Sequence, residues 1–181
     1  MIQSPSLAQI ALLLVIPATA AACVTDIRSR RIPNALVAAL FVSALGLHAA
    51  QGWISLIVCI AVFAAVFAAG TLAFSVGIAG GGDVKLAAAC AMLFTPPLAA
   101  EFLLYTFLCG GVLAIAVSLY HGRLSAALRN ASGIGTMIVH GVRPGLPSAV
   151  PAKLPYALAF FAGAVLVSLS QTLFPTLRLF S

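Results

Sequence analysis

Two carboxylates stand out in a 181-residue chain that has only three acidic side chains. Asp26 follows a long apolar run, and Asp83 precedes another, directly after three consecutive glycines in the stretch GGGDVK. Two carboxylates held about 3 Å apart cannot both ionise readily, so one keeps a proton while the other can activate water. Such a pair can hydrolyse a peptide bond and requires neither a metal nor a cofactor.

Judged from the sequence around them, Asp26 and Asp83 can each have a simpler role. Asp26 can pair with Arg28 or Arg30, and Asp83 can cap the N-terminus of a following helix, where the helix dipole favours an anion. Glu101, the third acid, is expected near the outer end of a membrane span as an interfacial residue.

The three glycines before Asp83 point beyond a simple helix cap, which needs only one good acceptor. Glycine costs backbone entropy, and it is favoured where another backbone comes close or where φ is positive. We therefore expect Gly80, Gly81 and Gly82 to let an extended peptide approach the Asp83 carboxylate, with Gly80 and Gly82 free to adopt positive φ.

The composition predicts an all-α polytopic membrane protein. Hydrophobic residues make up 63% of the chain and charged residues 7%, with a mean hydropathy of +1.19. A bilayer core about 30 Å thick needs roughly 20 apolar residues per helix, and an open strand edge is not viable in lipid. About six spans are expected, the fourth short enough to dip rather than cross, in apolar runs over residues 7–24, 35–50, 53–74, 84–99, 102–119 and 156–174.

The basic residues predict the orientation. Of nine lysines and arginines, eight fall on one side of the predicted spans and only Arg178 on the other. The positive-inside rule makes the eight-charge side cytoplasmic, with both termini outside and with Asp26 and Asp83 at cytoplasmic ends of spans. The net charge of +6 is therefore a topology signal, which favours contact with anionic lipid headgroups and gives no reason to expect a nucleic-acid partner.

No metal or cofactor site is expected. The four cysteines occur singly, without a C-x-x-C pair or a histidine at ligand spacing. The whole chain, residues 1–181, is interpreted as one membrane-embedded domain. It contains one long cytoplasmic loop, residues 120–154, which is expected to lie on the membrane surface.

The two acidic motifs together resemble those of the GxGD aspartic proteases, prepilin peptidase branch. GGGD fits the family's G-x-G-D motif, DIRSRRIPN at 26–34 resembles its first-aspartate motif, and KLPYALAFFAGA at 153–164 resembles its entry into the last span. The resemblance implies that Asp26 and Asp83 are the catalytic pair. By the same resemblance Arg31, Lys85 and the three glycines belong to the supporting motifs, with the role of Lys85 left open.

The Pro33-Asn34 pair gives the first motif a local physical basis. Proline fixes φ, and Asn34 can cap the following helix, so that the chain turns back toward the membrane close to Asp26.

The loop after Asp26 is too short, at about eight residues, for the cysteine-containing methylase domain of larger prepilin peptidases. The chain is thus similar to the short, peptidase-only form found with Flp/Tad-type pili. The resemblance implies a prepilin or pseudopilin substrate, cut after a glycine between its short basic leader and its hydrophobic helix. Three alternatives remain: an archaeal preflagellin-type peptidase, a small proton-coupled transporter and a structural membrane scaffold. The oligomeric state is left open.

Overall fold

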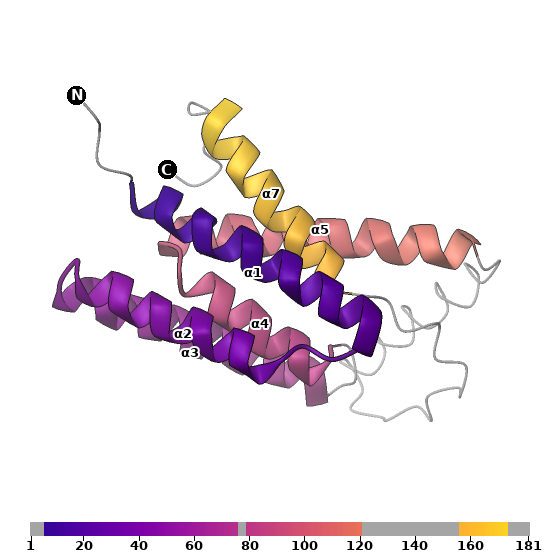
Figure 1. The fold of residues 1–181 in the computed structure, drawn as a ribbon, viewed down its shortest axis with the longest axis horizontal. Helices are drawn as coiled ribbons and strands as arrows, with labels where there is room; N and C mark the ends of the chain where they lie inside the picture. Colours follow the sequence, from indigo (N-terminus) through magenta and orange to yellow (C-terminus); the bar gives the residue numbers. More distant parts are fainter. Residues whose placement is uncertain (1–5, 76–78, 121–155, 174–181) are drawn as a thin grey trace, which may run out of the picture. The chain divides into compact units, whose positions relative to one another are not determined.

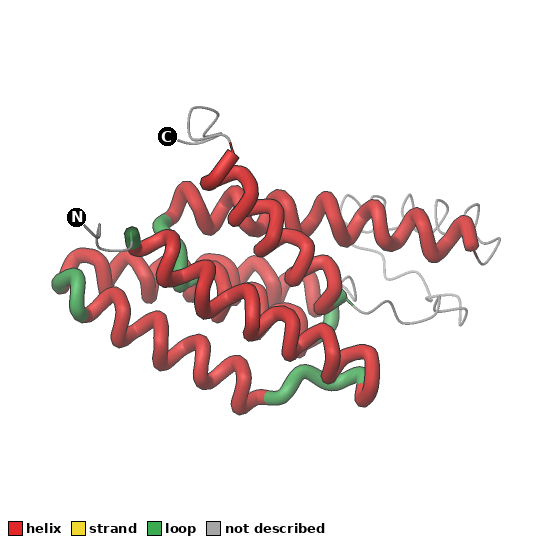
Figure 2. Tube along the Cα trace, turned by 45° about the horizontal axis from the view of Figure 1, so that its top comes forward, coloured by secondary structure: helices red, strands yellow, loops and turns green. Residues whose placement is uncertain are grey.

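Every regular element in the described part of the chain is a helix (Figures 1 and 2). The structure is a computed structural model and describes residues 6–75, 79–120 and 156–173. The helices are α1 (Leu7–Ser29), α2 (Asn34–Ala49), α3 (Trp53–Ser75), α4 (Gly81–Ala91), α5 (Pro96–Tyr120) and α7 (Ala157–Leu173). This confirms the predicted all-α class.

Three helices, α1, α3 and α5, are long and apolar enough to cross a membrane. Two others, α2 and α7, are apolar but shorter, at 16 and 17 residues. The architecture is therefore that of a polytopic membrane protein. The large hydrophobic side chains that remain exposed on α3, such as Ile54 and Leu72, are those expected of a surface that faces lipid.

The fourth predicted run is interrupted in the structure. Helix α4 has 11 residues, so it is only about 16 Å long at 1.5 Å per residue. The run was expected to continue through residue 99, but Pro96 and Pro97 cannot donate helical hydrogen bonds, and they instead open α5. The intervening Met92, Leu93 and Phe94 are buried, which satisfies the requirement that irregular backbone in a membrane protein be enclosed by protein.

The chain divides into two compact units, one formed by Met1–Cys109 with Pro155–Ser181 and the other by Gly110–Leu154. In the first unit α4 packs against α2 and α3, and α1 packs against α2 and α7. The described part of the second unit is the last turns of α5. Residues 121–154 of the predicted cytoplasmic loop lie outside the described residues.

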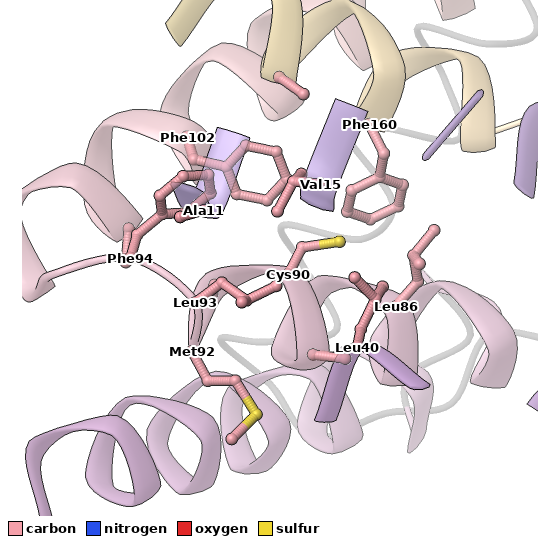
Figure 3. Close-up of a cluster of buried hydrophobic side chains, with 14 of the residues drawn as sticks. Ala11, Val15, Leu40, Leu86, Cys90, Met92, Leu93, Phe94, Phe102 and Phe160 are labelled. Carbon is pink, nitrogen blue, oxygen red and sulfur yellow. The ribbon is translucent and has the colours of Figure 1, made fainter. Parts of the chain in front are cut away.

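The core of the first unit surrounds α4 (Figure 3). Leu86 and Cys90 of α4 are fully buried in the same cluster as Val15 of α1. The ring of Phe102 lies with its centroid 5.5 Å from that of Phe94 and 6.4 Å from that of Phe160. These contacts connect the turn after α4 to the start of α5 and to α7.

Two glycines allow close helix packing. A Cβ built on Gly70 of α3 would lie 2.6 Å from Cγ1 of Val84, the residue that follows Asp83. A Cβ on Gly163 of α7 would lie 2.9 Å from the backbone nitrogen of Thr106 in α5. Because real Cβ contacts are essentially never so short, both glycines are needed for these helices to approach as they do.

Candidate active site

Asp26 lies in the last turn of α1 and is partly buried. The helix continues to Ser29, five residues beyond the predicted end of the run. Its C-cap is Arg30, at φ 52°, whose backbone N–H donates to the Asp26 carbonyl oxygen. The left-handed conformation at Arg30 turns the chain sharply, and the connection to α2 is therefore short.

Pro33 and Asn34 start α2 in a different way from the one expected. Pro33 is the N-cap, at φ −62° and ψ 128°, and its carbonyl accepts from the N–H groups of Leu36 and Val37. The expectation that Asn34 caps α2 is wrong, because Asn34 is already the first helical residue and no side chain caps this helix. Proline takes the cap position since its fixed φ suits an extended residue. Arg31, Pro33 and Asn34 are all exposed.

Asp83 lies in the first turn of α4, outside the three helices that are long enough to span a membrane. The N-cap is Gly80, so Asp83 is the third helical residue, and its carboxylate accepts a hydrogen bond from the Gly80 backbone N–H. The expectation that Asp83 is itself the cap is wrong, because Gly80 is the N-cap and the helix begins at Gly81; Asp83 lies in the first turn, where the helix dipole favours an anion.

The three glycines adopt no left-handed backbone. Gly80 has φ −82° and ψ 145°, and among the described glycines only Gly52 has a positive φ. The expectation of positive φ at Gly80 and Gly82 is therefore wrong. The close approach instead involves the acid itself, because a Cβ on Gly80 would lie 2.7 Å from Oδ2 of Asp83.

Gly82 packs against Ile32, in the connection between α1 and α2 that contains the Arg-Ile-Pro-Asn motif. A Cβ on Gly82 would lie 3.6 Å from Cβ of Ile32, which is an ordinary van der Waals distance, and one on Gly81 would lie 3.6 Å from the Phe74 ring. The contact between Gly82 and Ile32 brings the segment after Asp26 against the segment before Asp83. Sequence reasoning did not single out Ile32, whose position in the Arg-Ile-Pro-Asn motif was the available signal.

The two carboxylates interact electrostatically. Burial and, after it, the negative charge of Asp26 raise the pKa of Asp83 from 3.8 to about 6, against a smaller lowering by the Gly80 N–H. The structure therefore brings near each other two acids that are separated in the sequence by two predicted spans. Lys85, two residues further along α4, is exposed, and residues at this spacing do not share a helix face.

Asp26 has a partner that sequence reasoning missed. The backbone N–H of Ala157, the first residue of α7, donates to Asp26 Oδ2 at an N···O distance of 3.5 Å. In the part of the chain that the structure describes, this amide takes the place of the Arg28 or Arg30 side chain that was considered as a partner. The available signal was the PYAL sequence at 155–158, which the family resemblance had already marked as the entry to the last span.

Glu101 is buried within the protein, and its place near the outer end of a membrane span stays a prediction. Only 4% of its surface is exposed, and Oε1 accepts a hydrogen bond of 2.6 Å from the Ser170 hydroxyl of α7. The partner from α7 compensates for burial of the carboxylate. Of the three acids in the chain, Glu101 is thus the one that stabilises the contact between α5 and α7.

Comparison with known proteins identifies the family of the chain. The model of the type IV leader peptidase family matches residues 13–115, which is more than half of the chain and includes both Asp26 and Asp83. Neither the curated proteins nor the solved structures give a match. The extent of the family match shows that this chain belongs to the type IV leader peptidase family.

Proposed function

We propose that this membrane peptidase is an aspartic endopeptidase that removes the short basic leader of a prepilin or pseudopilin, with Asp26 and Asp83 as its catalytic pair. The observation that carries the proposal is that Asp26 of α1 and Asp83 of α4 lie near enough for the negative charge of Asp26 to raise the pKa of Asp83. A pair in which one carboxyl keeps its proton and the other is ionised is the arrangement that aspartic peptide hydrolysis requires.

The pair can hydrolyse a peptide bond without a covalent intermediate. One carboxylate takes a proton from water as the water oxygen attacks the scissile carbonyl carbon, while the protonated partner gives its proton to the carbonyl oxygen. As the C–N bond of the resulting diol breaks, the first carboxyl passes its proton to the leaving nitrogen and the second recovers a proton from the diol. The products are the leader carboxylic acid and the new N-terminal amine of the pilin.

The proposed substrate follows from the family and from the short connection between α1 and α2. No room for a methylase domain exists between α1 and α2, because the connection from Arg30 to Pro33 is only four residues long. This supports the short Flp/Tad-type form, which cuts its substrate after a glycine just before the hydrophobic helix. The test is co-expression of the wild-type chain with such a prepilin, with a size shift on a gel as the expected result. A prepilin that stays uncut would favour a transporter or a scaffold.

The cleavage site is proposed to lie at the cytoplasmic face of the inner membrane. From the distribution of basic residues, reporters fused at Arg30 and Gly133 are expected to report cytoplasm, and one fused at Ser181 the outer side. A C-terminal reporter on the cytoplasmic side would contradict the orientation and would mean one fewer crossing, with the 11-residue α4 as the element that does not cross.

The rate of cleavage is expected to fall as the pH rises above about 6. Burial and the charge of Asp26 raise the pKa of Asp83 to about 6, so its neutral form predominates below that pH and is lost above it. If protonated Asp83 is required, kcat/KM falls up to about tenfold per pH unit well above the pKa. The measurement is the pH profile of the reconstituted enzyme. A rate that rises steadily between about pH 6 and about pH 9 would show that Asp83 does not supply the proton.

A further inference from the structure

We infer that the main-chain amide of Ala157, at the start of α7, is a positioning group that orients Asp26 and favours its ionised form, which makes Asp26 the base of the pair. The inference rests on the proposed catalytic role of Asp26. It begins from the hydrogen bond between the Ala157 N–H and Asp26 Oδ2, which joins residues from opposite ends of the chain.

The position of Asp26 at a helix C-terminus explains why a hydrogen-bond donor such as the Ala157 N–H is needed there. Asp26 lies in the last turn of α1, and the partial negative charge at a helix C-terminus disfavours an anion there. Ala157 is the first residue of α7, where the partial charge is positive and the N–H groups lack helical partners. The N-terminus of α7 therefore offsets the unfavourable end of α1 at the carboxylate that has to ionise.

The position of the Ala157 amide is fixed by packing along the whole of α7. Ala157 itself has no exposed surface, and α7 packs against α1. Further along, the backbone of Gly163 lies against Thr106, and near the other end of the helix the Ser170 hydroxyl donates to Glu101. A shift of α7 along its axis would break these contacts, so they fix the position of the Ala157 amide relative to Asp26.

This arrangement divides the two chemical roles. The hydrogen bond from the Ala157 amide is stronger to an ionised carboxylate than to a protonated carboxyl group, so Asp26 is the carboxylate that takes the proton of the attacking water. At Asp83, burial and the negative charge of Asp26 raise the pKa by more than the Gly80 N–H lowers it, so Asp83 carries the proton that goes to the carbonyl oxygen. The amide acts through Asp26 and needs no contact with the substrate.

The variant Ala157→Pro tests the inference because it removes the N–H at a position where proline is tolerated. Ala157 is the first residue of α7, and the carbonyl of the preceding Tyr156 accepts from the Phe160 N–H. The first helical position is the one that proline favours. The matched comparison is Ala157→Gly, which keeps the N–H. We expect kcat for the proline variant to be at least about tenfold below that of the glycine variant with KM unchanged, and the acid limb of its pH profile to move to higher pH. Equal kcat and equal profiles in the two variants would overturn the inference.

A spectroscopic measurement tests the same bond without relying on folding of the proline variant or on activity. In detergent-solubilised protein labelled with ¹⁵N-alanine, we expect the Ala157 amide resonance to move as Asp26 titrates and this movement to be absent in Asp26→Asn. An Ala157 resonance with the same pH dependence in both proteins would overturn the inference. If wild-type protein cleaves no prepilin but the resonance behaves as expected, the proposed function fails while the contact between Ala157 and Asp26 stands.

Discussion

Replacing either Asp26 or Asp83 by asparagine is expected to abolish cleavage of a co-expressed prepilin while leaving insertion into the membrane intact. Asparagine keeps the shape of the side chain, but it can neither accept the proton of water nor supply one to the carbonyl oxygen. General acid and base catalysis each contribute about 10² to 10⁴ in rate, so each variant should lose at least about 10²-fold. The readout is the gel shift of the pilin beside the amount of enzyme in the membrane.

Glu101→Gln is the matched control, because it removes the only other acidic side chain of the protein. The Gln amide oxygen can still accept the hydrogen bond that Ser170 donates to Glu101, so cleavage should be retained. Asp83→Asn should also fold well at neutral pH. Burial raises the pKa of Asp83, which means that its ionised form destabilises the folded protein above about pH 6 and that the neutral amide avoids this cost. Near wild-type processing by either aspartate variant would refute the assignment of the pair.

Adding a single methyl group at Gly80 is expected to cost at least about tenfold in cleavage with little loss of protein. In Gly80→Ala the new Cβ would lie 2.7 Å from Asp83 Oδ2, so the carboxylate has to rotate away. The displaced atom is the end of a side chain, which keeps the effect on folding small, but Asp83 loses its place beside Asp26. Valine at Gly80 fills still more of this space and should be worse.

Gly46→Ala is the control for the loss of a glycine, since nothing lies within 4 Å of a Cβ at Gly46 in α2. It should cleave like the wild type. Gly82→Ala addresses the separate idea that the glycines admit a substrate backbone, because its Cβ would meet Ile32 only at an ordinary 3.6 Å. Lost cleavage at normal yield in Gly82→Ala would support substrate approach at that position. Normal cleavage in Gly80→Ala would show that the Asp83 carboxylate does not depend on a glycine at position 80 for its placement.

The helices could largely be predicted from the sequence because apolar composition alone decides which segments enter a bilayer. Trp53 to Ser75 agrees with the predicted third run to within one residue. The C-terminal end of the fourth run was predicted wrongly because hydropathy treats Pro96 and Pro97 as mild interruptions, whereas the backbone cannot form helical hydrogen bonds through them. The same local chemistry explains why Pro33 rather than Asn34 caps α2.

In the candidate site, only residues with reactive side chains could be predicted from the sequence. Asp26 and Asp83 are conspicuous in a chain with three acids, and their motifs pointed to the family. Ala157 contributes through a backbone N–H, and every non-proline residue has one, so only the packing of α7 on α1 distinguishes it. The burial of Glu101 likewise depends on Ser170, a distant residue that no sequence pattern linked to it.

The most direct test of the catalytic pair is the intact mass of a prepilin incubated with the purified, membrane-reconstituted protein, measured for the wild type and for Asp26→Asn and Asp83→Asn in parallel. We expect the wild type to yield one product, shortened by its basic leader at the bond after the glycine that precedes the hydrophobic helix. We expect the full-length mass with both variants. A shortened product of equal abundance with either variant, or an unchanged mass with the wild type, would contradict the claim that Asp26 and Asp83 form a leader-cleaving pair.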